Sequence, residues 1–232
     1  MENPGCYTRA IYRHEAEVLY VNLLIASTYI SEDLSLTIET DFRTSEQVKI
    51  CLNQTVTTEK TIKIRVPSWV KSPVRHIYNN ETFEQLEAGD INVIALFHEG
   101  YKILVTLPMC LYEYVSMDDT NKIAVMYGPI VLAAQLVRES FPKEDIVSNH
   151  LSLMTHSIIR VPKLIAESTS IEEWASLVDR ETLTFKTTAI AQPGDVSFIL
   201  KPFYATHHER YSLYLFKYTP QEYKQMNDEV LT

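Results

Sequence analysis

Residues 34–42 read LSLTIETDF, and the alternation of apolar and polar side chains along this stretch decides the class of fold. The apolar residues at positions 34, 36, 38 and 42 fall on one face of an extended chain, and the polar residues at 35, 37, 39 and 41 fall on the other. A period of two is typical of a strand that buries one face of an antiparallel sheet.

Comparable runs continue along the first half of the chain. Strands are predicted at 48–52 (VKICL) and 60–67 (KTIKIRVP). The dipeptide Asn79-Asn80 predicts a hairpin turn between VRHIY and ETFEQL, because Asn tolerates positive φ. A second hairpin is predicted between 92–97 (NVIALF) and 101–108 (YKILVTLP), with Gly100 in its turn. This half of the chain is therefore predicted to be all-β.

The second half begins after a polar, turn-rich junction at 115–122. Residues 122–136 (KIAVMYGPIVLAAQL) are apolar on both faces, which predicts a central strand pair with a bend at Gly128-Pro129. A loop is expected at 138–157. One short helix is predicted at 170–178, with Ser170 as its N-cap, and a terminal helix at 220–230. Strands are expected at 183–190, 196–204 and 210–218, so the whole chain is predicted to form two packed β-sandwiches with one or two short helices.

The composition and net charge of the chain disfavour some classes of binding partner. The apolar fraction of 46% is that of a folded protein, and the net charge of −9 argues against nucleic acid and against anionic membranes as partners. The longest apolar run, residues 18–26, is too short to span a bilayer. The first residues lack a basic start followed by an apolar stretch, so we expect no secretory signal in this chain. Three scattered cysteines form neither a disulfide framework nor a metal-binding spacing.

Candidates for chemistry are few. The run His207-His208-Glu209 contains metal-ligand types, but adjacent histidines on a strand point to opposite faces, so a shared ion is disfavoured. An independent hydrolase that uses His207 or His208 with a carboxylate stays open as an alternative. A glycosidase needs two carboxyl groups about 5–10 Å apart across a sugar pocket. The carboxylate pairs at 15/17, 118/119 and 172/173 lie near turns or a helix start and are interpreted as solvated charge.

Two tryptophans are available for stacking on a sugar. Trp69 lies at a strand end and Trp174 within the predicted short helix, and both positions are more often part of a core than of a binding platform. The chain has only 5 Gly, no Gly-rich phosphate loop and no G-x-S-x-G motif, which disfavours nucleotide binding and serine hydrolase chemistry. A carbohydrate-binding module that uses these tryptophans is therefore a second alternative.

Four segments, in the same order, resemble the C-terminal region of glycoside hydrolase family 127, the β-L-arabinofuranosidase-like family. They are MEN…IYRH…LYVNLLIAS (1–27), TIKIRVPSWV (61–70), VTLPMCLYEY with NKIAVMYGPIVLAA (105–134), and LKPFYATHHERYSLYLF (200–216). The resemblance implies jelly-roll-like sandwiches at 12–116 and 117–232, with residues 1–11 as a remnant of the connection to a preceding (α/α)6 barrel. It also assigns His207, His208 and Arg210 to a structural signature of the last strands.

The resemblance places the catalytic cysteine, the zinc and the acid/base carboxylate in that barrel, which this chain lacks. No catalytic, cofactor-binding or metal-binding residue is carried over to this sequence, and Cys6 has no neighbouring Cys to replace the family's pair. We therefore expect a non-catalytic region that braces a barrel and docks on it through an apolar patch that includes Tyr7 and Tyr12. The family resemblance implies a cytoplasmic or a periplasmic location.

Overall fold

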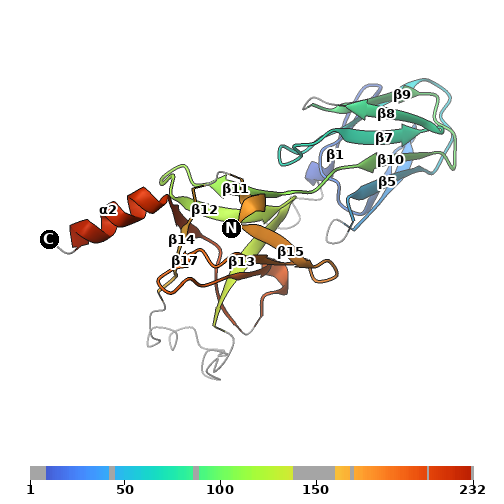
Figure 1. Ribbon diagram of the computed structural model, residues 1–232. Helices are drawn as coiled ribbons and strands as arrows, with labels where there is room; N and C mark the ends of the chain where they lie inside the picture. Colours follow the sequence, from blue (N-terminus) through green and yellow to red (C-terminus); the bar gives the residue numbers. More distant parts are fainter. Residues whose placement is uncertain are drawn as a thin grey trace, which may run out of the picture. The chain divides into compact units, whose positions relative to one another are not determined.

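The computed structural model describes residues 9–41, 45–85, 89–137, 160–167, 170–207 and 209–230. The chain divides into two compact units, Met1–Cys110 and Leu111–Thr232, and both are built almost entirely from strands (Figure 1). No helix within the described ranges is both long enough and apolar enough to cross a membrane. Phe42 and the loop expected at 138–157 lie outside the described residues.

Unit 1 contains two sheets. The first has the order β1-β2-β6-β9 and is antiparallel except for the parallel pair of β2 and β6. Its strands are β1 (Tyr12–Glu15), β2 (Val18–Val21), β6 (Lys60–Ile64) and β9 (Ile91–Ala95). The second is wholly antiparallel, with the order β3-β4-β5-β10-β7-β8. Its strands are β3 (Ser27–Ile30), β4 (Ser35–Thr40), β5 (Gln47–Leu52), β7 (Val74–Tyr78), β8 (Glu81–Gln85) and β10 (Lys102–Thr106).

A single apolar core joins these two sheets. Ile38 of β4 and Ile62 of β6 are both buried in it, and so is Phe97, which lies between β9 and β10. The alternation in residues 34–38 therefore works as predicted, because Leu34, Leu36 and Ile38 all reach this core. Burial of one face of each sheet against the other is the arrangement of a β-sandwich, so the predicted fold class is confirmed.

One of the two predicted hairpins in this unit is confirmed and the other is wrong. Strands β7 and β8 pair across Asn79 and Asn80, which have φ of 50° and 65°, as a two-residue hairpin turn requires. The strands at 92–97 and 101–108 do not pair with each other. Strand β9 lies at the edge of the four-stranded sheet, whereas β10 lies between β5 and β7 in the other sheet. The connection crosses the sandwich, and Gly100, with φ +83°, supplies the turn before β10.

Unit 2 is built on one long sheet with the order β15-β16-β18-β13-β12-β20-β14-β17, to which β11 is added beside β12 and β19 beside β13. Its strands are β11 (Leu111–Val115), β12 (Lys122–Tyr127), β13 (Ile130–Val137), β14 (Lys163–Ile165), β15 (Ala175–Asp179), β16 (Thr184–Thr187), β17 (Ala191–Gln192), β18 (Ile199–Pro202), β19 (Arg210–Ser212) and β20 (Leu215–Tyr218). Side chains from both ends of this order, such as Ala175 and Ala191, enter one core, so the sheet folds over on itself. The central pair predicted at 122–136 is confirmed as β12 and β13.

The helix predicted at 170–178 is wrong in all but its first turn. Residues Ile171–Glu173 form a single 3-10 turn, η3, and the Ser170 side chain makes no capping hydrogen bond. The following residues form β15, which pairs with β16. Nine residues are too few for an isolated helix to be stable, and pairing with β16 satisfies the backbone instead. The terminal helix is confirmed as α2 (Pro220–Val230), with Thr219 and Glu222 bonded to each other at its start.

Candidate functional site

The two tryptophans proposed as sugar platforms both contribute to apolar cores. Trp174 has only 3% of its surface exposed and packs among the core residues of unit 2. Trp69 is half-buried and packs against the core of unit 1. A ring buried as deeply as that of Trp174 offers no face to a sugar in solution, because stacking requires an open aromatic surface. The sugar-stacking role of Trp69 stays a prediction.

The His207-His208-Glu209 run is divided by its surroundings. His207 is exposed, and His208 lies outside the described residues. The Glu209 side chain is only 6% exposed; it accepts a hydrogen bond from Gln135 of β13 and lies 3.7 Å from Nζ of Lys201 of β18. These contacts connect the segment before β19 to the sheet. Within the described ranges, no three His, Cys, Asp or Glu side chains gather as a metal site would require.

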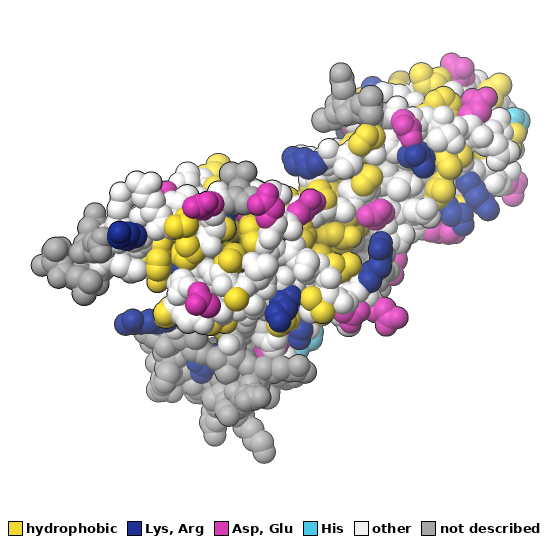
Figure 2. All heavy atoms as spheres, in the orientation of Figure 1, with side chains coloured by type: hydrophobic (Ala, Val, Ile, Leu, Met, Phe, Trp, Pro, Cys, Tyr) yellow, Lys and Arg dark blue, Asp and Glu magenta, His cyan; other side chains and the backbone are white. Residues whose placement is uncertain are grey.

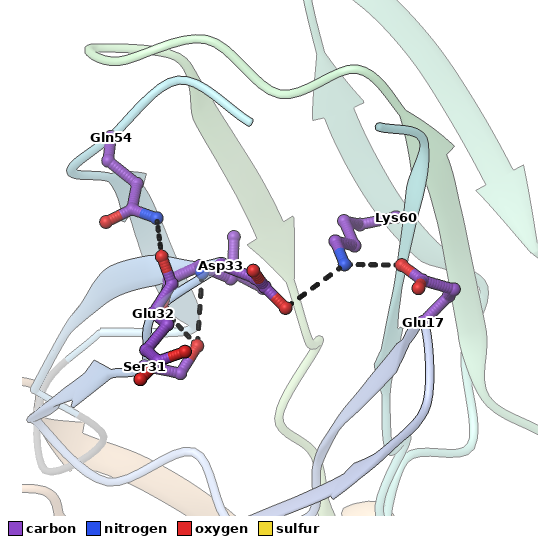
Figure 3. Close-up of polar contacts among 7 residues, drawn as sticks. Glu17, Ser31, Glu32, Asp33, Gln54 and Lys60 are labelled. Carbon is purple, nitrogen blue, oxygen red and sulfur yellow. Dashed lines mark hydrogen bonds and ion pairs between the residues drawn. The ribbon is translucent and has the colours of Figure 1, made fainter. Parts of the chain in front are cut away.

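A buried lysine is the main polar feature of unit 1 (Figure 3). Lys60 starts β6, and only 7% of its side chain is exposed. Its ammonium donates a hydrogen bond to the carboxylate of Glu17, and its Nζ lies 3.7 Å from Oδ2 of Asp33. Glu17 precedes β2 and Asp33 lies between β3 and β4, so the three residues connect one sheet to the other.

The surroundings of Lys60 indicate a structural role. The pKa of Lys60 is raised, chiefly because its charged form donates to Glu17. An ammonium that stays protonated cannot act as a nucleophile or a general base near neutral pH. Ser31 holds the loop that carries Asp33 (Figure 3). Its hydroxyl donates to the carbonyl oxygen of Leu34 at 2.9 Å and accepts from the backbone N–H of Leu34 at 3.1 Å. We therefore interpret the Lys60 cluster as a clamp between the sheets.

A second ion pair lies in unit 2 at the edge of a depression. Nζ of Lys217, in β20, lies 2.6 Å from both carboxylate oxygens of Glu113, in β11. The side chains are only 17% and 11% exposed. The depression has a volume of about 600 Å³ and is also lined by residues of β11, of the turn before β12 and of η3. It is the largest of the three depressions described within the units.

A smaller depression of about 450 Å³ lies over the six-stranded sheet of unit 1, where Ile77 and Leu104 are flanked by Lys49 and Lys102. Nζ of Lys49 lies 2.6 Å from Oε2 of Glu39. This ion pair already uses one of the hydrogen-bond donors that Lys49 could offer to a ligand. On the face shown in Figure 2, basic and acidic side chains are interspersed over the surface. This pattern gives no reason to assign an anionic macromolecule to either unit.

Aromatic side chains also gather where β1 and β3, the edge strands of the two sheets of unit 1, approach each other. The Tyr12 and Tyr29 ring centroids are 5.2 Å apart, and the Tyr12 hydroxyl lies 2.9 Å from Oγ of Ser27. His14 stands edge-on to Tyr29 at 6.2 Å. Burial raises the pKa of Tyr12, so its hydroxyl stays protonated well above neutral pH. Ile30, at the end of β3, is 77% exposed. We call Tyr12, His14, Tyr29 and Ile30 the edge patch; Tyr7 lies outside the described residues.

Two family models match successive parts of the chain. Residues 18–109 match a family model described as "Beta-L-arabinofuranosidase, GH127 middle domain". Over this stretch the chain is similar to a GH127 middle domain. Residues 113–217, which lie within unit 2, match a second model, DUF4986, described as a domain of unknown function. The resemblance stated from the sequence, to the region that follows the barrel in family 127, is thereby confirmed. No curated protein matches the chain.

Solved structures carry the same fold. A GH127 β-L-arabinofuranosidase from Geobacillus stearothermophilus superposes with a TM-score of 0.59 at 14% identity, over 91% of this chain and 35% of that one. A second GH127 β-arabinofuranosidase gives 0.63 at 17% identity, over 90% of this chain and 37% of that one. A further glycoside hydrolase gives 0.63 at 17% identity, with coverages of 91% and 37%. The chain thus spans little more than a third of these structures.

The two units contain polar pairs that sequence reasoning missed. Lys60 lies on an alternating strand at a position of the same parity as Ile62 and Ile64, and Glu113 and Lys217 are 104 residues apart. Parallel pairing of β2 with β6 brings Lys60 beside Glu17, and no local pattern announces that pairing. The parity of Lys60 with Ile62 and Ile64, which places it on the buried face, is a local signal that could have pointed to it.

Proposed function

We propose that this chain is the non-catalytic sandwich region of a GH127-type glycoside hydrolase and that it supports a separate helical catalytic domain. The observation that carries the proposal is the pair of family matches, which together follow the chain from residue 18 to residue 217. The solved relatives support it, because they share this fold over only 35–37% of their own length. The remaining part of a whole enzyme has room for the chemistry.

The polar clusters of the chain fit a supporting role. Glu17, Glu113 and Glu209 each hold a lysine or an amide of a neighbouring strand, so these carboxylates contribute to the fold. A general acid needs a carboxyl group that faces bound substrate and can give up its proton. A carboxylate whose oxygens already bond a lysine or an amide of the protein has fewer acceptor positions left for a substrate, which suits a structural role better than proton transfer.

The edge patch of unit 1 is the surface that we assign to the catalytic domain. It lies where, among the described residues, an edge strand of each sheet has backbone groups available for pairing, and it carries the partly buried rings of Tyr12 and Tyr29. Ile30, the next residue on β3, points to the outer face of its sheet and is exposed. Aromatic side chains are typical of the central part of a protein interface, and Ile30 adds an exposed apolar side chain on the other face of the same edge strand. Tyr12 was assigned to this surface from the sequence, and its position on β1 supports that assignment.

The proposal is tested by complementation of activity. The helical domain of a GH127 enzyme from the same organism is produced without its sandwich region, and release of p-nitrophenol from an aryl β-L-arabinofuranoside is measured. We expect no release by the chain alone. We expect the helical domain to gain activity and thermal stability when an equimolar amount of the chain is added. Hydrolysis by the purified chain alone, or a helical domain unaffected by the chain, would overturn the proposal.

A further inference from the structure

We propose that the depression beside Glu113 and Lys217 in unit 2 is a binding site for a neutral saccharide, recognised through two adjacent hydroxyl groups. This proposal does not depend on the docking function of unit 1, because every residue that lines the depression belongs to unit 2. It assigns a ligand class to a domain that is described only as one of unknown function.

The ion pair supplies both kinds of hydrogen-bonding group that a diol needs. Lys217 Nζ lies 2.6 Å from each oxygen of Glu113, so a donor group and two acceptor atoms lie side by side. An ammonium has three N–H donors, and each carboxylate oxygen accepts more than one hydrogen bond. One hydroxyl of a vicinal diol can accept from Lys217 while its neighbour donates to Glu113. Charge-assisted bonds of this type are about twice as strong as those between neutral groups.

The rest of the lining suits a sugar ring. Thr120 contributes a hydroxyl group at one side, and Glu172 of η3 contributes a carboxylate at the rim. Val115, at the end of β11, is 45% exposed and offers an apolar surface to the C–H groups of the ring. Small-molecule sites combine apolar walls with a few polar groups that fix orientation. A volume of about 600 Å³ lies within the usual range for such sites.

Charge decides between neutral and acidic sugars. The charges of Glu113 and Lys217 cancel within the pair, and Glu172 then leaves the depression with a net negative charge. The whole chain carries a net charge of −9. A uronic acid would bring a like charge to this surface, which opposes binding. A neutral sugar avoids that repulsion and still uses both partners of the ion pair.

Titration followed by NMR tests the site. The probes are a neutral arabino-oligosaccharide, a neutral galacto-oligosaccharide and, as the charged comparison, trigalacturonate. We expect at least one neutral probe to saturate at concentrations below about 10 mM. Its shifts should concentrate at amides 111–115, 120 and 170–172. We expect trigalacturonate to bind at least about tenfold more weakly.

Substitutions in and outside the depression distinguish specific saccharide binding from non-specific binding to the surface. Lys217→Met should weaken binding of the neutral probe roughly tenfold or more, because one charge-assisted hydrogen bond is lost. Lys122→Met is the matched control: Lys122 is also an ion-paired lysine of unit 2, but it does not line the depression, and its loss should leave binding unchanged. Since Lys217→Met could unfold the unit, Thr120→Val at the exposed rim is measured as well and should weaken binding severalfold.

Three results would overturn the inference. The first is absence of saturable binding by both neutral probes. The second is equal binding by the wild type and a folded Lys217→Met or Thr120→Val variant. The third is tighter binding of trigalacturonate than of either neutral probe.

Discussion

Lys217 of β20 holds both carboxylate oxygens of Glu113 of β11 at 2.6 Å, although the two residues are 104 positions apart in the chain. Strand β12 explains the contact, because it pairs with β11 along its whole length and with β20 at its first residues. The ion pair thus fixes the edge strand β11 to the interior of the unit 2 sheet.

Breaking this pair is expected to destabilise unit 2. Glu113→Gln or Lys217→Met alone should each lower the free energy of unfolding by about 1–3 kcal/mol, because the remaining charge loses its partner in a largely buried place. The double variant should lose less than the sum of the two single losses. Urea unfolding of the four proteins measures this coupling. Strictly additive losses would show that the two side chains do not stabilise each other.

The Lys60 clamp is expected to give the chain an alkaline dependence of stability. The folded-state pKa of Lys60 is raised, chiefly by the hydrogen bond to Glu17, above an unfolded value of about 10.4. The stabilisation is therefore fully present below about pH 10 and is lost as the pH rises through the folded-state pKa. Lys60→Met should lower the urea midpoint between pH 7 and about pH 9.5, and the difference from wild type should shrink above about pH 10.5.

Lys49→Met is the control for that experiment. Lys49 also forms an ion pair, with Glu39, but 36% of its side chain is exposed, so its contribution to stability should be small at every pH. A Lys60→Met variant that loses the same stability at pH 7 and at pH 11 would contradict the clamp.

Two substitutions of Trp174 test whether its buried ring stabilises unit 2 through packing or through hydrogen bonding. The indole is buried, and its Nε1 has no hydrogen-bond partner among the described residues. Trp174→Phe keeps most of the buried apolar surface and removes an unpaired donor, so it should change stability by less than about 1.5 kcal/mol. Trp174→Ala should cost about 3–5 kcal/mol, because it leaves a cavity in the core. Thermal unfolding compares the two, and equal losses would argue against a core role for the ring.

The hairpin between β7 and β8 depends on positive φ at both turn residues. Asn80 has φ of 65°, a conformation that Gly adopts freely and that β-branched residues avoid. Asn80→Gly should therefore leave stability within about 0.5 kcal/mol of wild type, while Asn80→Val should cost about 1–2 kcal/mol. Chemical denaturation followed by circular dichroism measures both. A neutral Asn80→Val would show that the turn rearranges without strain.

Local patterns predicted the strands well and their partners less well. Alternation at 34–38 and the turn at Asn79-Asn80 needed only neighbouring residues, and both are confirmed. The pairing of 92–97 with 101–108 was wrong, because the short connection crosses from one sheet to the other, and two alternating strands around a Gly look the same in either arrangement. Whether a strand joins one sheet or the other depends on how all the strands of the unit pack around the core, which no local pattern shows.

The helix expected at 170–178 failed for a different reason. Ile171, Trp174 and Ala175 are all buried, and a spacing of three and four residues is typical of a helix face. In the structure the first two belong to a single 3-10 turn and its end, and the third starts a strand that pairs with β16. Long-range pairing also assembles the polar clusters around Lys60 and Glu113, so their partners could not be predicted from local patterns, although the parity of Lys60 with Ile62 and Ile64 indicates its burial.

The most direct test of the supporting role is the affinity of the chain for a GH127 helical domain, measured by sedimentation velocity or calorimetry. Ile30→Asp places a charge in the edge patch, whereas Ile94→Asp places the same charge on β9, at the opposite edge of the four-stranded sheet, where 60% of the isoleucine is exposed. We predict that the wild type and Ile94→Asp bind with similar affinity and that Ile30→Asp binds at least about tenfold more weakly. No binding by the wild type, or equal binding by both variants, would contradict the account.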